Sequence, residues 1–166
     1  MLSGVMSWMF TSAWISSSRS RHVAIKKFLR QKQFEMRPML TFEKLTPGDN
    51  LGTNTQYFDD DVAADWLELF PEDKEDLPEL PPGMISAITM RAFLATVQPR
   101  PKGNIHGTQE FTVHKFPKLG DEIITTTLCK EKETRKSNNW VYFETQSHDQ
   151  NGELLFTGSM GIIWGG

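Results

Sequence analysis

The sequence predicts an α+β domain in which an antiparallel β-sheet wraps around one central apolar helix. The first observation is the segment "MISAITMRAFLATV", residues 84–97, in which Arg91 is the only charge. The second is the series of four β-rich segments that follows residue 103. A helix that is apolar on nearly every side must be covered on nearly every side, and a curved sheet can cover it.

Two short elements are expected before this helix. Residues 45–58 open with a Pro-Gly-Asp turn and end in a short strand. Residues 59–70 have helical spacing of apolar side chains and an Asp at 59–61 to cap the first turn. The apolar positions are Val62, Trp66, Leu67 and Phe70. An acidic loop with several prolines, residues 71–83, then leads to the apolar helix.

The apolar helix itself should be mostly core. Ala87, Ala92 and Ala95 predict one stripe on which another element approaches closely. We expect the sheet to cover most of the helix and a second subunit to close the remaining side.

The four β-rich segments are residues 104–116, 121–134, 139–149 and 153–164, separated by turn sequences. Alternation at Phe111 and Val113, and again at Val141 and Phe143, indicates strands that bury one face. His114 has the opposite parity to Val113, so it should be exposed or at an interface. His106, eight residues earlier, should point the same way as His114 unless a bulge intervenes.

Charge divides the 166-residue chain unevenly. The net charge is −3, yet residues 1–34 contain no acid and six basic side chains, so residues 35–166 have a net charge of −9. An acidic body argues against nucleic acid as the main partner, because binding phosphates needs concentrated positive charge.

The N-terminal extension, residues 1–39, is set apart from a single domain at 40–166. Its apolar part is too short to span a membrane and is followed by the basic charges, unlike a secretory signal. An over-extended start with Met36 or Met39 as the first residue, an organelle transit peptide and a packing arm all remain open. The expected location is the cytoplasm, or the mitochondrial matrix if the extension is a transit peptide.

Metal, cofactor and disulfide chemistry are not expected. Cys129 is the only cysteine, which fits a reducing compartment. The four histidines, His22, His106, His114 and His148, form no pair with metal-ligand spacing.

The order of these motifs resembles a known family. A strand and a helix precede "PPGM", residues 81–84, then come the apolar helix, "HGTQEFTVHKFPKLGDEI", residues 106–123, and three further strands. This is similar to the hotdog fold of the MaoC-like and FAS1-like acyl-thioester dehydratases and hydratases, over residues 40–164. The chain looks most like the N-terminal, non-catalytic half of double-hotdog enoyl-CoA hydratases.

The resemblance implies that the glycine end of the helix faces the thioester. The first N–H groups of a helix lack internal acceptors and carry the positive end of its dipole, so they can stabilise an oxyanion. Pro82, Gly83 and Met84 are therefore the expected substrate-binding residues. The alternative is that Pro82 and Gly83 only start the helix.

The catalytic pair of the family has no counterpart here. Its hydratases carry an Asp and, five residues later, a His before the central helix, and these act as general acid and base. The corresponding residues 68–83 contain carboxylates at Asp73, Glu75, Asp76 and Glu79 but no histidine. His106 is the candidate for a displaced catalytic residue. A hotdog thioesterase is disfavoured, because residues 84–97 contain no carboxylate and their Ser86 and Thr89 have no adjacent base.

Three functions remain open. The chain could be a hydratase-type subunit without its own Asp/His pair that binds acyl-CoA or an acyl-carrier thioester beside a catalytic hotdog partner. It could be a complete homodimeric enoyl-CoA hydratase with displaced residues, or a thioesterase or non-enzymatic acyl-CoA-binding module. One structural feature that would separate these functions is whether the pocket near Gly83 is open or is filled by the large side chains of Trp140, Phe143 and Trp164. A second is whether Arg100 and Lys102 contact the phosphates of coenzyme A or lie in a solvated loop.

Overall fold

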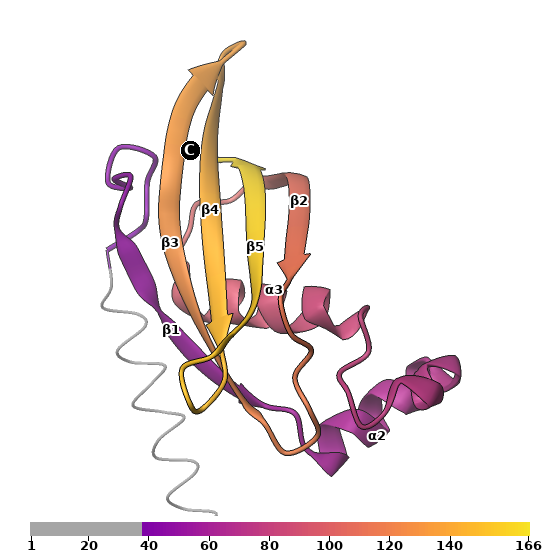
Figure 1. The fold of residues 1–166 in the computed structure, drawn as a ribbon. Helices are drawn as coiled ribbons and strands as arrows, with labels where there is room; N and C mark the ends of the chain where they lie inside the picture. The colour runs from indigo at the N-terminus through magenta and orange to yellow at the C-terminus, as the bar shows by residue number, and fades with distance from the viewer. Residues whose placement is uncertain (1–37) are drawn as a thin grey trace, which may run out of the picture. The chain divides into compact units, whose positions relative to one another are not determined.

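Five strands form one antiparallel sheet in the computed structural model, which describes residues 38–166 (Figure 1). The strands are β1 (Asn50–Tyr57), β2 (Ile105–Val113), β3 (Glu122–Arg135), β4 (Asn138–His148) and β5 (Leu154–Ile163). Their order in the sheet is β1-β3-β4-β5-β2, so β1 and β2 are the edges. The predictions for the N-terminal extension concern residues that lie almost entirely outside the described range.

The central strands form because their side chains alternate strictly. In the first half of β3 and in most of β4, buried and half-buried residues alternate along the strand. Such alternation buries one face of the sheet and leaves the other facing water. The four predicted strands after the apolar helix are confirmed.

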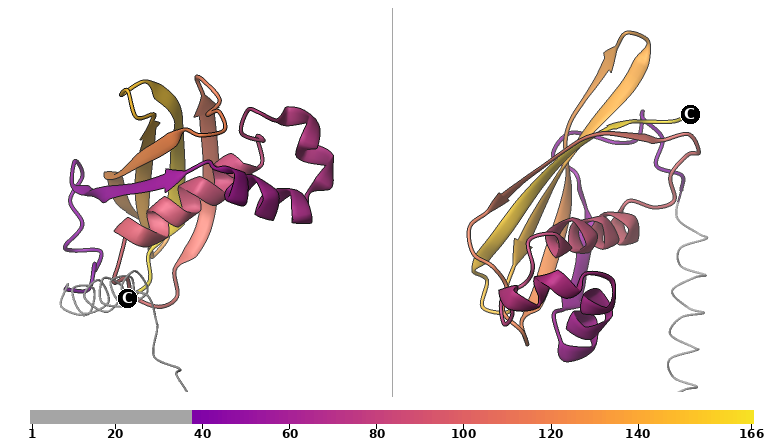
Figure 2. Two further views of the ribbon diagram at one scale, coloured as in Figure 1. Left: turned by 90° about the horizontal axis from the view of Figure 1, so that it is seen from below. Right: turned by 90° about the vertical axis from the view of Figure 1, so that its right-hand side faces the viewer.

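Helix α3 (Met84–Thr96) lies across the concave face of the sheet (Figure 2). Its inner side is buried, whereas Arg91, Leu94 and Ala95 are exposed along its outer side. The predicted alanine stripe is wrong, since Ala92 is fully buried under the sheet and Ala95 lies on the exposed side. The prediction of a central helix covered by an antiparallel sheet is confirmed.

Two hydrophobic clusters fill the space between helix and sheet, one at each end of α3. The cluster at the C-terminal end contains Phe93, Val97, Phe143 and Trp164. The cluster at the N-terminal end contains Met84, Ile85, Phe156 and Phe58. Phe143 and Trp164 therefore lie at the end of α3 away from Gly83. Trp140 lies on the outer face of the sheet, against Gly107. None of the three fills the space near Gly83, which answers the question left open by the sequence.

Helix α2 (Asp60–Leu69) and the 3₁₀-helix η1 (Pro71–Asp76) precede α3. Asp59 caps α2 by accepting a hydrogen bond from the Val62 amide at 2.9 Å, as expected from the sequence. We call residues 59–79 the arm. It projects sideways beyond the β2 edge of the sheet, on the side that carries α3 (Figures 1 and 2).

Candidate functional site

The start of α3 is a tight turn that uses its own first amides. The Met84 amide donates to the Pro81 carbonyl at 2.9 Å, and the Ile85 amide donates to the Pro82 carbonyl at 3.3 Å. Gly83 is exposed, and no acceptor for its amide is found among the described residues. Of the three predicted substrate-binding residues, Gly83 is therefore the one whose N–H remains free, because Pro82 has none and that of Met84 is used.

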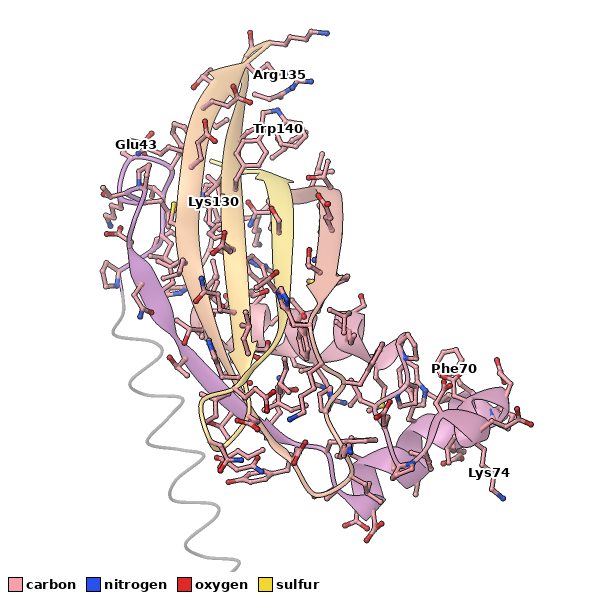
Figure 3. All side chains as sticks on the ribbon, in the orientation of Figure 1. Glu43, Phe70, Lys74, Lys130, Arg135 and Trp140 are labelled. Carbon is pink, nitrogen blue, oxygen red and sulfur yellow. The ribbon has the colours of Figure 1, made fainter. Side chains whose placement is uncertain are left out.

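Trp66 is the side chain that lies against this turn. A Cβ added to Gly83 would meet the Trp66 ring at 3.3 Å. The Trp66 indole N–H donates to Asp73 Oδ2 at 2.7 Å, and its ring centroid lies 4.4 Å from that of Phe70. Phe70 is labelled on the arm in Figure 3. Asp73, one of the candidate acids, thus holds a wall of the site in place.

A pocket of about 490 Å³ opens beside Trp66, between α2, α3 and the end of β1. Apolar side chains from α2 and α3 form most of its wall: Val62, Trp66, Leu69, Met84, Ala87 and Ile88. Gln56, Tyr57, Asp59, Asp65 and Arg91 complete the lining. Pockets of this size and composition take small organic ligands, with the few polar groups fixing the orientation.

The polar side chains of this pocket are only partly used by the fold. Gln56 donates from Nε2 to the Ile88 carbonyl at 2.9 Å, while its Oε1 is buried without a partner. Asp59 is the cap of α2. Arg91 makes no ion pair or hydrogen bond within the described residues. The site is therefore a largely apolar pocket with the unpaired guanidinium of Arg91 in its lining, two helical turns after Met84.

The other candidate acids surround the site without entering it. Glu75, Asp76 and Glu79 are all exposed on the arm. The backbone of Glu79 forms a bridge with Lys118. No imidazole pairs with these carboxylates: the pocket lining contains no histidine, and none of the described histidines, His106, His114 and His148, makes an ion pair.

His106 lies at the opposite end of the sheet from Gly83. It pairs with Ile162, which belongs to the cluster at the C-terminal end of α3, whereas Val113 at the other end of β2 pairs with Phe156. Its Nε2 lies 3.1 Å from the Thr108 carbonyl, and it is exposed. The strand rises about 3.3 Å per residue, so one chain does not bring His106 to the carboxylates of the arm.

A bulge decides which way His106 points. The register of β2 against β5 shifts between His106 and Thr108. A regular strand would place the side chains of His106 and His114 on the same face of the sheet. Because the bulge adds one residue to β2, they lie on opposite faces. His106 shares the face of its partner Ile162, the face that carries α3, while His114 is exposed, as its parity predicted.

The remaining sequence candidates are placed as follows. Ser86 is exposed on α3 and Thr89 is fully buried with its hydroxyl unpaired, and neither has a neighbouring base in the described hydrogen-bond network. Arg100 lies over the Phe93 ring at 5.4 Å. Among residues 38–166 there is no group of three His, Cys, Asp or Glu side chains that could hold a metal ion. None of their helices is long and apolar enough to cross a membrane.

Sequence reasoning missed the roles of Trp66, Gln56 and Arg91 in this site. Trp66 was expected only as an apolar position of a helix. Gln56 falls in a short strand without a motif. Of the three, only Arg91 could have been singled out from the sequence, because it is the only charged residue in the apolar segment 84–97.

Solved structures share this architecture. The R-hydratase PhaJ1 from Pseudomonas aeruginosa matches with a TM-score of 0.59 and 20% identity, covering 76% of this chain and 86% of that one. A MaoC-like dehydratase from Rhodospirillum rubrum matches with a TM-score of 0.61 and 19% identity, covering 75% and 97%. The HadBC 3R-hydroxyacyl-ACP dehydratase complex from Mycobacterium tuberculosis matches with a TM-score of 0.55 and 13% identity, covering 70% and 97%. Each is a similarity of fold.

The architecture is thus that of a hotdog domain. The family model "FAS1-like, dehydratase domain region" matches residues 75–158, half of the chain, and the protein belongs to this family of MaoC-like hotdog dehydratases. A comparison with curated protein sequences finds no match.

Proposed function

We propose that the chain is an acyl-thioester-binding subunit of the hydratase or dehydratase type, without an Asp/His pair of its own, which works with a hotdog partner. The observation that carries this proposal is the largely apolar pocket of about 490 Å³ beside the start of α3. An acyl chain would lie along α3, and the free Gly83 amide would donate to the thioester carbonyl. Pro82 and Met84 would shape the turn that presents it.

The partner is proposed because one chain lacks an imidazole at this site. The segment between α2 and α3 supplies carboxylates only, and His106 lies at the other end of the sheet. Two of the similar structures, the HadBC complex and the ChsH1–ChsH2 complex from Mycobacterium tuberculosis, are assemblies of more than one chain. This supports a hotdog partner for this chain, whether a catalytic subunit or a second copy.

A complete homodimeric hydratase is the second candidate. The bulge in β2 turns His106 to the face that carries α3 and leaves it exposed. If a second copy brought its His106 to the carboxylates of the arm, the pair needed for general acid and base catalysis would be assembled across the dimer. We place either activity in the cytoplasm, or in the mitochondrial matrix if the N-terminal extension is a transit peptide.

The test measures binding and turnover separately with the purified full chain. Octanoyl-CoA binding is followed by calorimetry, and hydration of crotonyl-CoA and of a longer enoyl-CoA by loss of absorbance at the enoyl-thioester band. Binding without turnover is expected. Turnover that His106→Ala abolishes would replace the first proposal by the second, and absence of both binding and turnover would contradict both.

A further inference from the structure

The pocket beside α3 has two ends along the helix. Met84, Ala87, Ile88 and Arg91 line it, and their spacing places them on one stripe of α3. Gly83 lies at the start of this stripe. Arg91 follows Gly83 by eight residues, a helical rise of about 12 Å. A ligand that is held by the Gly83 amide therefore reaches Arg91 only with its far end.

The end beside Gly83 is apolar, because Trp66 forms its wall. A Cβ added to Gly83 would meet the Trp66 ring at 3.3 Å. Met84 lines the same end and is 4% exposed. The first carbons of an acyl chain, next to the thioester carbonyl, would lie against these two side chains.

The other end, around Arg91, is polar. Gln56 Nε2 donates to the Ile88 carbonyl at 2.9 Å, which brings the end of β1 to this part of α3. Tyr57 and Asp59 follow Gln56 closely in the chain and also line the pocket. Ile88 precedes Arg91 by less than one helical turn, so these polar side chains and the guanidinium share one end of the pocket.

The fold leaves two of these polar groups available to a ligand. Arg91 is exposed and forms no ion pair with any of residues 38–166. Asp59 accepts the Val62 amide with Oδ1, while its Oδ2 accepts no hydrogen bond from the residues that the structure describes. A guanidinium that can donate and a carboxylate oxygen that can accept therefore line the polar end.

The charges around the pocket decide which ligand group suits both. The arm holds ten acidic side chains and a single base, a net charge of −9, and two of its acids, Asp59 and Asp65, line the pocket. A carboxylate on the ligand would be attracted by Arg91 and repelled by the arm. A hydroxyl is uncharged, accepts from a guanidinium and donates to a carboxylate. A hydroxyl therefore fits this end better than an anion does.

We propose that the pocket takes an acyl chain that carries a hydroxyl at its far end, with Arg91 donating to that hydroxyl and Asp59 accepting from it. This inference rests on the proposed function and specifies its substrate class. The hydroxyl that a hydratase adds to the third carbon is a different group, since it stays close to the thioester carbonyl at the Gly83 end. Arg91 and Asp59 thus select the acyl chain and take no part in the chemistry at the thioester.

The experiment is calorimetric titration of the purified full chain with octanoyl-CoA, 8-hydroxyoctanoyl-CoA and suberyl-CoA, which ends in a carboxylate. The three ligands share their carrier and chain length, so differences in Kd report on the terminal group. Arg91→Met removes the donors and keeps a long side chain, whereas Arg91→Lys keeps a cationic donor. Lys102→Met is the control, because it removes an exposed positive charge that does not line the pocket.

The native chain should bind 8-hydroxyoctanoyl-CoA about tenfold more tightly than octanoyl-CoA, as expected for a hydrogen bond to a charged group. Arg91→Met should bring the ratio of these two Kd values to about one. Arg91→Lys should keep part of the preference, and Lys102→Met should keep all of it. Tightest binding of suberyl-CoA, or a preference for the hydroxyl that survives Arg91→Met, would overturn the proposal.

The two proposals fail in different ways. Absence of binding by all three ligands would contradict the proposed function and the hydroxyl subsite with it. Octanoyl-CoA that binds at least as tightly as 8-hydroxyoctanoyl-CoA would overturn the subsite alone. The acyl pocket would then stand, with Arg91 as a solvated side chain at its rim.

Discussion

Lys136 and Ser137 connect β3 to β4 as a two-residue turn with φ values of 50° and 64°. Both lie in the left-handed region, where an L-residue with a Cβ is strained and glycine is not. Ser137→Gly should therefore raise the free energy of unfolding by about 0.5–1 kcal/mol, measured by urea denaturation. Ser159→Gly in the middle of β5 is the matched control and should lower it. An unchanged or lower stability for Ser137→Gly would contradict the argument.

Gly83 bears on the site itself. Its φ of −61° suits any residue, so Gly83→Ala should change the free energy of unfolding by less than about 1 kcal/mol. The added Cβ would lie 3.3 Å from the Trp66 ring, on the side of the turn where we propose the thioester carbonyl to bind. Octanoyl-CoA binding should weaken about tenfold, a value typical of a lost or displaced hydrogen bond. Undiminished binding measured by calorimetry would remove Gly83 from the proposed site.

The turn between β4 and β5 depends on one carboxylate. Asp149 is 4% exposed and accepts hydrogen bonds from the amides of Glu153 and Asn151, both at 2.8 Å. The Glu153 amide, the Asn151 amide and the nearby Lys115 lower the pKa of Asp149 below its ordinary value, although burial acts in the opposite direction.

Because the folded-state pKa is lowered, the Asp149 carboxylate stabilises the fold above its unfolded pKa of about 3.9. This stabilisation is lost as the pH falls through the folded value. Asp149→Asn should be less stable than the native chain at pH 7 and should lose less stability on acidification to about pH 2. The urea midpoint of both proteins across this pH range is the measurement. Parallel pH profiles would show that Asp149 does not contribute in this way.

The arm differs from the rest of the domain in how it is held. Ala63 is the only buried residue of α2, and η1 has none, whereas α3 buries seven residues. Segments with little burial open locally at a smaller free-energy cost than the core. Amides of residues 60–76 should exchange with deuterium faster than those of α3, and bound octanoyl-CoA should slow them. Slow exchange in the free protein, or no effect of the ligand, would contradict this assignment of the pocket.

The whole molecule should be stabilised by its own concentration if it pairs as proposed. A dimer that forms only from folded chains shifts the unfolding equilibrium by mass action. The Tm of the native chain should rise with protein concentration if its hotdog partner is a second copy of the same chain. Scanning calorimetry over a hundredfold range of concentration tests this. A Tm that does not depend on concentration would contradict a dimer.

The fold was largely predictable because its determinants are local and periodic. The apolar run at residues 84–97 and the alternation at Val141 and Phe143 specify a buried helix and half-buried strands whatever their neighbours are. The Asp59 cap and the turn sequences between the strands act within a few residues of themselves. The motif at residues 81–84 and the strand after the helix, taken together, were enough to identify the family.

The site was predictable only in part. Gly83 was proposed from the sequence because the first amides of a helix carry the positive end of its dipole, and its role in substrate binding stays a prediction. Trp66 could not be placed against it, since that contact depends on how the arm folds back through its bond with Asp73. The position of His106 required the bulge in β2, which shifts the register by one residue and changes the face of the side chain.

The sequence by itself determined the hotdog architecture, the charge division between residues 1–34 and the rest of the chain, and the lack of a histidine between α2 and α3. These properties follow from composition and short-range periodicity, which do not depend on the path of the chain. Only the tertiary structure decided that Trp66 and Arg91 share a pocket, that His106 lies at the opposite end of the sheet from Gly83, and that the arm projects past β2. Such relations join residues far apart in the sequence, and long-range packing and strand register set them.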